Sequence, residues 1–430
     1  MKLQYTMNPR TLLTDSFHAA VGAADPLKIV AAHLPQPPKG RTLVVGAGKA
    51  AASMARAVEL AWPADAPLEG LVVTRYAHGM ETEHIRVIEA GHPVPDGAGE
   101  AAAAEILALT SELTENDLLI ALVSGGGSSL LSLPVASVPM ADLKAVTNSL
   151  LRSGAPITEM NIVRKHLSRV QGGRLAAACR APVVTLVISD VTGDDPSAIA
   201  SGPTCADAST YADALHIIER FSVDAPASVL AHLKAGAAGT IDETPKPADP
   251  VLAHVSNSVI ATAHQSLQAA AEFFRERGIQ PVVLGDTVTG EASEVAKVYA
   301  AMVREIRTHQ QPFKPPVALI SGGECTVTVK GNGRGGRCAE FLTSLAVELD
   351  GMPDVFALAA DTDGIDGTED NAGALLFPDS PARALAKQVN AQKMLSNNDG
   401  YSYFEALGDL LITGPTRTNV NDYRVILILS

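Results

Sequence analysis

A lysine beside two glycines is the first group in this sequence that could do chemistry. VVGAGKAA (44–51) follows a β-branched run and precedes an Ala-rich run, so Gly46 and Gly48 fall in a strand-to-helix turn. The spacing fits G-x-G-x-x-A, a relaxed dinucleotide fingerprint, but the next strand ends at Thr74–Arg75 without a ribose-binding acid. A plain tight turn is the alternative. Because Lys49 opposes the helix dipole, we expect it to face a bound anion.

A glycine-serine run gives a stronger indication of phosphate binding. SGGGSS (124–129) directly follows a buried strand, where backbone N–H groups and hydroxyls can hold phosphate. A flexible turn is the alternative. No Walker A sequence occurs, so a nucleotide site must be of another kind. The residues that we expect to contact the nucleotide here, together with Gly46 and Gly48, are Ser124, Gly125, Gly126, Gly127, Ser128 and Ser129.

A second Ser-Gly-Gly follows a buried strand in LISGGECTVTV (319–329). We expect Gly322, Gly323 and Glu324 to contact the same cofactor, and the alternation in 325–329 predicts a hairpin strand. GNGRGGRCAEF (331–341) then places two arginines among glycines at a helix start. Arginine forks suit carboxylates and phosphates, so Arg337 is a candidate catalytic residue.

Aspartates follow two further strands. Asp190 comes directly after an apolar strand, where open α/β sheets bind ligands, and we predict that it is catalytic and binds Mg²⁺. Asp194 and Asp195 serve equally well as turn and cap residues. AADTDGIDGTEDNAGA (359–374) has Ile365 where an EF-hand needs an oxygen ligand, so that motif is excluded. Asp361 and Asp363 remain candidate metal ligands.

Other polar residues have simpler interpretations. His92 in GHPVPD reads as a turn histidine. The basic residues of NIVRKHLSRVQGGRL (161–175) read as a solvated helix face, although in so acidic a chain they can also guide an anionic substrate.

The elements that position these residues alternate between short β-branched runs and Ala-rich helical stretches. Such alternation predicts an α/β protein with a Rossmann-like, doubly wound parallel sheet. The Gly- and Pro-rich stretch at 236–250 interrupts the rhythm as a linker would. We therefore expect an N-terminal domain over 1–243 and a C-terminal region over 244–430.

Composition narrows the classes of function. The chain has 430 residues and a net charge of −14, which argues against nucleic acid and anionic membranes as partners. The N-terminus has no signal-peptide pattern, and no apolar run reaches the length of a membrane helix. Four cysteines without CxxC spacing indicate reduced thiols and no structural zinc. We expect a cytoplasmic enzyme with a small-molecule substrate. A homodimer is compatible with this expectation.

Taken together, these motifs resemble the glycerate 2-kinase family with a MOFRL C-terminal domain, whose members are often labelled hydroxypyruvate reductase from tartrate-utilisation operons. The matching segments run in family order from about residue 10 to 425 and include VVGAGKAAASMA, LVSGGGSSLL, VISDVTGDDPSAIASGPT and NNDGYSYFEALGDLLITGPTRTNVND. The chain departs from the family at Cys338-Ala339, where many members have an Asn-Gln pair.

The resemblance implies ATP, Mg²⁺ and D-glycerate, with 2-phospho-D-glycerate as product. It also implies a smaller mixed-sheet MOFRL-type domain over about 315–425, an active-site cleft between the domains, and Lys49 and Arg337 in that cleft. Arg337 or a neighbouring cation would hold the carboxylate of glycerate. Two rivals stay open: an NAD(P)H-dependent hydroxypyruvate reductase, and a non-catalytic metabolite-binding module.

Overall fold

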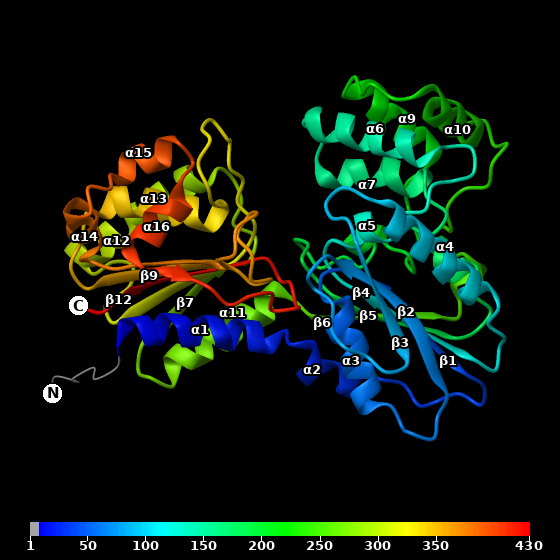
Figure 1. Cartoon of the computed structure of the whole chain (residues 1–430), viewed down its shortest axis with the longest axis horizontal. Coiled ribbons are helices and arrows are strands. Elements are labelled where there is room, and N and C mark those ends of the chain that lie inside the picture. Colours follow the sequence, from blue (N-terminus) through cyan, green and yellow to red (C-terminus); the bar gives the residue numbers. More distant parts are fainter. Residues whose placement is uncertain (1–7) are drawn as a thin grey trace. The chain divides into compact units, whose positions relative to one another are not determined.

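Two compact units make up the described chain, residues 8–430 of this computed structural model. The parallel-sheet unit contains Pro26–Ile260, and the mixed-sheet unit combines the described residues up to Asp25 with Ala261–Ser430. Figure 1 shows that each unit is built around its own sheet. Across residues 8–430, no helix combines the length and the apolar character needed to cross a bilayer.

The parallel-sheet unit has a six-stranded sheet in the order β3-β2-β1-β4-β5-β6. Its strands are β1 (Thr42–Ala47), β2 (Leu68–Arg75), β3 (Ile85–Ala90), β4 (Leu118–Val123), β5 (Val183–Ile188) and β6 (Val255–Ala261). The pairings among β1 to β5 are parallel. The strand order reverses between β1 and β4, and open α/β sheets bind ligands at such a switch point, outside the carboxyl ends of the strands.

Helices of this unit form two groups. Around the sheet lie α2 (Pro26–Ile29), α3 (Ala51–Ala61), α4 (Gly97–Ser111), α5 (Gly127–Leu130) and α8 (Arg174–Ala177). A separate helical cluster contains α6 (Met140–Arg152), α7 (Ile157–His166), α9 (Tyr211–Arg220) and α10 (Ala227–Ala237) (Figure 1). This cluster has its own apolar core, which includes Val146, Val163 and Tyr211. It stands beside the β4 loop and therefore supplies side chains to the switch point.

The mixed-sheet unit has six strands in the order β11-β10-β9-β12-β8-β7. They are β7 (Gln280–Gly285), β8 (Val317–Ser321), β9 (Val355–Asp361), β10 (Gly373–Leu376), β11 (Leu410–Leu411) and β12 (Asp422–Ile428). The β7–β8 pair is parallel, and the other neighbours are antiparallel. The predicted α/β class, with one parallel sheet and one mixed sheet, is confirmed.

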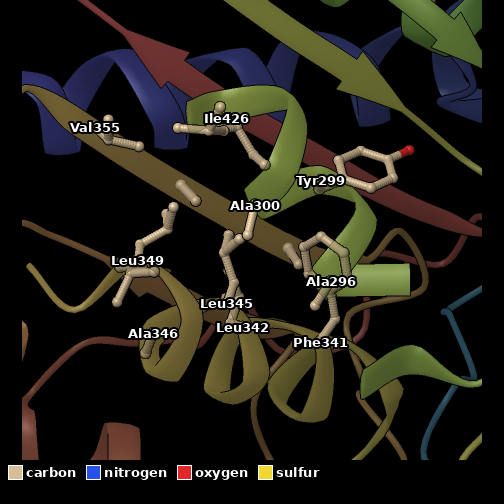
Figure 2. Close-up of a cluster of buried hydrophobic side chains, with 14 of the residues drawn as sticks. Ala296, Tyr299, Ala300, Phe341, Leu342, Leu345, Ala346, Leu349, Val355 and Ile426 are labelled. Carbon is tan, nitrogen blue, oxygen red and sulfur yellow. The ribbon is translucent and has the colours of Figure 1, made fainter. Parts of the chain in front are cut away.

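Helices cover both faces of the mixed sheet. On one face, α1 (Pro9–Ala23) and α11 (Ala263–Arg275) share a core with β12 residues. On the other, α12 (Ala292–His309) and α13 (Arg337–Leu349) pack against β9 and β12, as the side chains in Figure 2 show. Phe341 at the centre is fully buried, which contributes about 1.5–3 kcal/mol. The shorter helices are α14 (Ser380–Ala386), α15 (Ala391–Ser396) and α16 (Gly400–Leu407).

The division between the units differs from the predicted boundary at 243/244. The stretch around it is held to the parallel-sheet unit, where Glu243 accepts from Tyr211 N and Pro245 O accepts from Asp207 N. The parallel sheet also needs β6, so that unit extends to Ile260. Conversely, α1 belongs with the mixed sheet, where Tyr423 Oη donates to Ser16 Oγ at 2.9 Å.

The predicted hairpin strand at 325–329 is wrong. These residues contribute a single bridge, from Thr326 to Glu291, and lie outside the strands of the mixed sheet. The alternation has another cause: Cys325 is buried in the core under α12, whereas Val329 is exposed.

Candidate functional site

The turn after β1 uses its backbone donors within the protein. Gly48 N donates to Val73 O (3.1 Å), Lys49 N to Gly125 O (2.8 Å) and Ala50 N to Ser124 Oγ (3.1 Å). A Cβ at Gly48 would lie 2.1 Å from Ser124 Oγ, so only glycine fits there. A dinucleotide fingerprint needs such N–H groups for the pyrophosphate. The turn after β1 therefore supports the β4 loop through hydrogen bonds, and its N–H groups are not available to a dinucleotide.

The loop after β4 keeps donors available. Gly127 N donates to Ser124 O and Ser129 N to Gly126 O, which fold the loop into the short helix α5. Within residues 8–430, no protein acceptor is found for the N–H groups of Gly125, Gly126 and Ser128. Gly126 has a φ of +80°, a left-handed conformation that glycine adopts without strain. Successive amides of this kind form an anion-binding concavity.

Positive charge surrounds this loop. A Cβ added at Gly126 would lie 2.9 Å from His92 Nε2 and 3.5 Å from Lys49 Cγ, so both side chains border it. Burial, together with the nearby charges of Lys49, Arg75 and His78, lowers the pKa of His92 to about 4. His92 is therefore neutral at pH 7 in an electropositive setting. The sequence assigned it to a turn, and its proximity to Gly126 was missed because the contact spans 34 positions.

The loop after β5 reaches the β4 loop through a serine that the sequence did not single out. Ser201 Oγ lies 2.8 Å from Ser128 Oγ and also donates to Asn161 Oδ1 at 3.4 Å. Ala200, Ser201 and Gly202 are three consecutive left-handed residues, with φ of 50°, 58° and 57°. Such strain in non-glycine residues is concentrated at functional sites. The Ser-Gly-Pro sequence at 201–203 was the available signal.

The aspartates after β5 separate into two roles. Asp195 accepts from both Ser197 N and Ser197 Oγ at 2.9 Å, so it stabilises its own turn. Asp190 lies two residues after β5 and is half-buried. It therefore stands at the carboxyl end of the parallel sheet, where it was predicted.

Arg337 lies at the first position of α13 in the mixed-sheet unit and is paired with acids. Its Nε donates to Asp422 Oδ1 (2.8 Å) and its Nη2 to Asp361 Oδ2 (2.7 Å), and Nη1 lies 3.2 Å from Glu324 Oε1. Burial alone would lower the pKa of Arg337, but these carboxylates raise it well above its usual range. Asp422 was missed by the sequence analysis because it lies 85 positions from Arg337.

The second Ser-Gly-Gly loop has its carbonyl groups and the Gly322 N–H bonded inside the mixed-sheet unit. Arg424, fully buried, donates to Gly322 O (2.8 Å) and Gly323 O (3.3 Å), and Gly322 N donates to Gly285 O. A Cβ at Gly323 would lie 2.4 Å from Val288 N. The loop is therefore built into its own unit, and its predicted cofactor contacts stay a prediction.

The acids after β9 are arranged as an internal network. Asp361 Oδ1 accepts from Asp363 N (3.0 Å), and Asp363 Oδ1 accepts from Ile365 N (2.8 Å). Asp366, fully buried, accepts from Cys338 N (3.0 Å) and Ala339 N (2.8 Å) and so caps α13. These bonds use the backbone of residues 338–339, so the departure from Asn-Gln leaves the cap intact.

The predicted metal ligands lie in both units: Asp190 belongs to the parallel-sheet unit, and Asp361 and Asp363 to the mixed-sheet unit. No group of three or more His, Cys, Asp or Glu side chains placed to hold a metal ion occurs within residues 8–430. Their role in metal binding stays a prediction.

Comparison with known proteins gives two family matches and full-length relatives. Residues 12–234 match the domain of unknown function DUF4147, and residues 317–422 match the MOFRL family. A protein named putative hydroxypyruvate reductase from Agrobacterium vitis is 49% identical over 98% of this chain and 95% of its own length. The D-glycerate 2-kinase of Thermotoga maritima is 38% identical over 95% of this chain and 96% of its own.

Solved structures agree with the sequence relatives. The crystal structure of a glycerate kinase from Thermotoga maritima superposes with a TM-score of 0.87 at 37% identity, covering 98% of this chain and 99% of that one. A Pyrococcus horikoshii protein superposes with a TM-score of 0.82 at 37% identity, covering 99% and 100%.

Proposed function

Because this chain belongs to the glycerate kinase family, in which a DUF4147 domain precedes a MOFRL domain, we propose that it phosphorylates the 2-hydroxyl of D-glycerate from ATP. The products are 2-phospho-D-glycerate and ADP. Kinase activity on glycerate is the activity named for the relatives found by sequence and for the Thermotoga maritima structure. The choice of the 2-hydroxyl follows the names of the relatives from Pyrococcus horikoshii and Thermotoga maritima.

The observation that carries the proposal is the β4 loop at the switch point of the parallel sheet. Its amides at Gly125, Gly126 and Ser128 have no acceptor within residues 8–430, and Lys49 lies beside them. Phosphoryl transfer depends mainly on positioning and on electrostatic stabilisation of charge that develops on the phosphoryl oxygens. A loop of open amides bordered by positive charge supplies both.

Each residue then has a defined task. The β4 loop holds ATP phosphates, and Lys49 neutralises the charge that builds up as the phosphorus–oxygen bond to ADP breaks and the bond to the 2-oxygen of glycerate forms. The proton of the 2-hydroxyl passes to a water molecule, and so to solvent, as the new bond forms. Mg²⁺, when bound, neutralises the phosphates further, and the carboxylate of Asp190 is of the ligand type that Mg²⁺ prefers.

Arg337 has a narrower role than the resemblance implies. Its three nitrogens already contact Asp422, Asp361 and Glu324, so its charge is balanced by acids of its own unit. A carboxylate substrate gains little from a guanidinium so neutralised. We therefore assign Arg337 to organising the strand ends of the mixed-sheet unit.

A reductase is the second candidate, because the 49% identical relative carries the name putative hydroxypyruvate reductase. The geometry of the β1 turn opposes this reading. A dinucleotide would need the N–H groups of Gly48, Lys49 and Ala50, and all three already donate to protein acceptors.

One experiment separates the two. The purified protein is incubated with ATP, Mg²⁺ and D-glycerate, and the phosphorylated isomer is identified by NMR. We expect 2-phospho-D-glycerate in that incubation. In parallel, NADH or NADPH absorbance is followed with hydroxypyruvate and no ATP. Consumption of the reduced nucleotide without any phosphoglycerate would overturn the proposal in favour of the reductase.

A further inference from the structure

A polar pocket adjoins the β4 loop inside the parallel-sheet unit. Its free volume is about 20 Å³, which is room for one water molecule or one carboxylate oxygen. Hydroxyl and amide side chains from α5, α6 and the segment after α7 line it, among them Ser129, Thr147, Ser168 and Gln171. One charged side chain also lines it, Arg164 of α7. Several donors of this lining already bond to the protein, because Ser129 Oγ donates to Gly126 O and Gln171 Nε2 donates to Ser128 O and Leu131 O. Arg164 is the one charged group of the lining, and its charge is positive.

Arg164 differs from its basic neighbours because it has no acidic partner. Lys165 lies 3.5 Å from Asp207, and His166 lies 3.3 Å from Glu243. For Arg164, no carboxylate within residues 8–430 lies at ion-pair distance, and its one side-chain hydrogen bond runs from Nη1 to Asn161 Oδ1 at 3.4 Å. The fold therefore places a carboxylate beside Lys165 and beside the His166 ring, and none at ion-pair distance from Arg164 within residues 8–430.

The cost of this arrangement indicates a ligand. Burial lowers the pKa of Arg164, and no neighbouring carboxylate opposes that effect. Leaving a half-buried guanidinium without an anion is destabilising. Arginine presents a planar fork of donors that matches a carboxylate with two parallel hydrogen bonds. A bound carboxylate would offset the burial cost and use the fork.

The pocket is also linked to the phosphate-binding loop. Asn161 Oδ1 accepts from Arg164 and from Ser201 Oγ, and Ser201 Oγ lies 2.8 Å from Ser128 Oγ. A molecule held by Arg164 would therefore stand next to the loop that we assign to ATP. This is the position required of the acceptor in a direct phosphoryl transfer.

We propose that Arg164 forms the acceptor's carboxylate subsite, which selects short 2-hydroxy acids over neutral polyols. The inference rests on the proposed kinase function for the identity of the acceptor. It assigns substrate specificity to the parallel-sheet unit and to a residue outside the β1 and β4 loops.

The test replaces Arg164 by glutamine, which keeps a polar side chain but cannot pair with a carboxylate. We expect Arg164→Gln to raise KM for D-glycerate roughly 10- to 100-fold, with KM for ATP changed by less than about threefold. Preference for D-glycerate over its neutral amide should fall by a similar factor. The control is Arg152→Gln, an exposed arginine at the end of α6, which should leave every constant unchanged.

Direct binding keeps this inference separate from the kinase assignment. D-Glycerate is titrated calorimetrically into wild-type and Arg164→Gln protein without ATP. Wild-type binding that is lost in the variant supports the subsite even if no phosphoglycerate forms. Equal binding, or an unchanged KM, overturns it even if the wild type is an active kinase.

Thermal melting excludes a merely structural role. Removal of an unpaired, half-buried charge should leave the melting temperature of Arg164→Gln equal to or above that of the wild type. If the variant does not fold, Arg164→Lys decides the question. A lysine cannot reproduce the two-pronged contact, so KM for D-glycerate should rise at least roughly tenfold. An unchanged KM in Arg164→Lys would overturn the proposal.

Discussion

Each unit of this protein places a Ser-Gly-Gly sequence after a buried strand, and the two loops have opposite electrostatic settings. In the parallel-sheet unit, the loop after β4 keeps amides open, with Lys49 and the neutral His92 beside it. In the mixed-sheet unit, the side chain of Arg424 donates to two carbonyl groups of the loop after β8. Carboxylates surround the neighbouring Arg337. The two loops therefore differ in the charged groups beside them: Lys49 borders the first, whereas a buried arginine holds the carbonyl groups of the second.

The two arginines sharpen this contrast. Arg337 meets three carboxylates, and Arg164 meets none within residues 8–430. An arginine surrounded by acids stabilises its own unit, whereas one that lacks them is prepared for an external anion. Whether a cation binds a ligand is thus decided by the counter-ions that the fold supplies, which the residue type alone does not reveal.

The largest effect is expected from removing the arginine that has partners. Arg337→Ala removes the guanidinium that pairs with the buried Asp361 and leaves Asp422 with Arg424 as its remaining ion pair, which should destabilise the mixed-sheet unit by about 3–5 kcal/mol. Hydrogen exchange of the α13 amides would measure this loss. Arg334→Ala is the control, because its contact with Glu369 lies at the surface and should matter far less. Equal hydrogen-exchange protection of α13 in the two variants would contradict the structural role that we assign to Arg337.

Removal of Lys49 should act on turnover rather than on stability. Because Lys49 faces the phosphoryl group in our proposal, Lys49→Ala should lower kcat by on the order of 10²-fold or more, with the fold retained. Steady-state kinetics with D-glycerate and ATP measure the change, and circular dichroism checks the fold. Lys39→Ala, at an exposed site of the same unit, should keep normal turnover. A folded Lys49→Ala protein with unchanged kcat would remove the lysine from the mechanism.

The sequence predicts most of the architecture because its signals are local. Alternating strands and helices give the parallel sheet, and the glycine motifs fall at the ends of β1 and β4 as expected. Contacts between distant residues could not be predicted in the same way. Asp422 pairs with Arg337 across 85 positions, and α1 joins a sheet formed by the other end of the chain.

Arg164 shows the limit for the site itself. On a helix with Lys165 and His166, it reads as part of a solvated basic face. Only the fold shows that its neighbours meet Asp207 and Glu243 while Arg164 does not. The turn after β1 shows a related limit, because its Lys49 and Ala50 N–H groups donate to Gly125 and Ser124 of the loop after β4, which the local sequence does not reveal.

The smallest expected effects are opposite pH dependences of stability in the two units. Burial raises the pKa of Asp366 to about 7 from its usual 3.8, although the amides of Cys338 and Ala339 oppose this. Between these values the folded state binds more protons than the unfolded state. This group's contribution to the stability of the mixed-sheet unit is therefore fully present below about pH 4 and is lost as the pH rises through 7.

His92 should give the reverse slope in the parallel-sheet unit. Its pKa of about 4 lies below the usual 6.5, so the unfolded state binds more protons in that interval, and stability rises with pH from 4 to 6.5. Hydrogen exchange of α13 and of α3 across this range, corrected for intrinsic rates, would measure both slopes. Asp366→Asn should flatten the first and His92→Gln the second, whereas His84→Gln, at an exposed site, should change neither. Unchanged pH slopes in Asp366→Asn and His92→Gln would show that neither side chain sets the pH dependence of its unit. The electrostatic difference between the two loops would then rest on Lys49 and Arg337 alone.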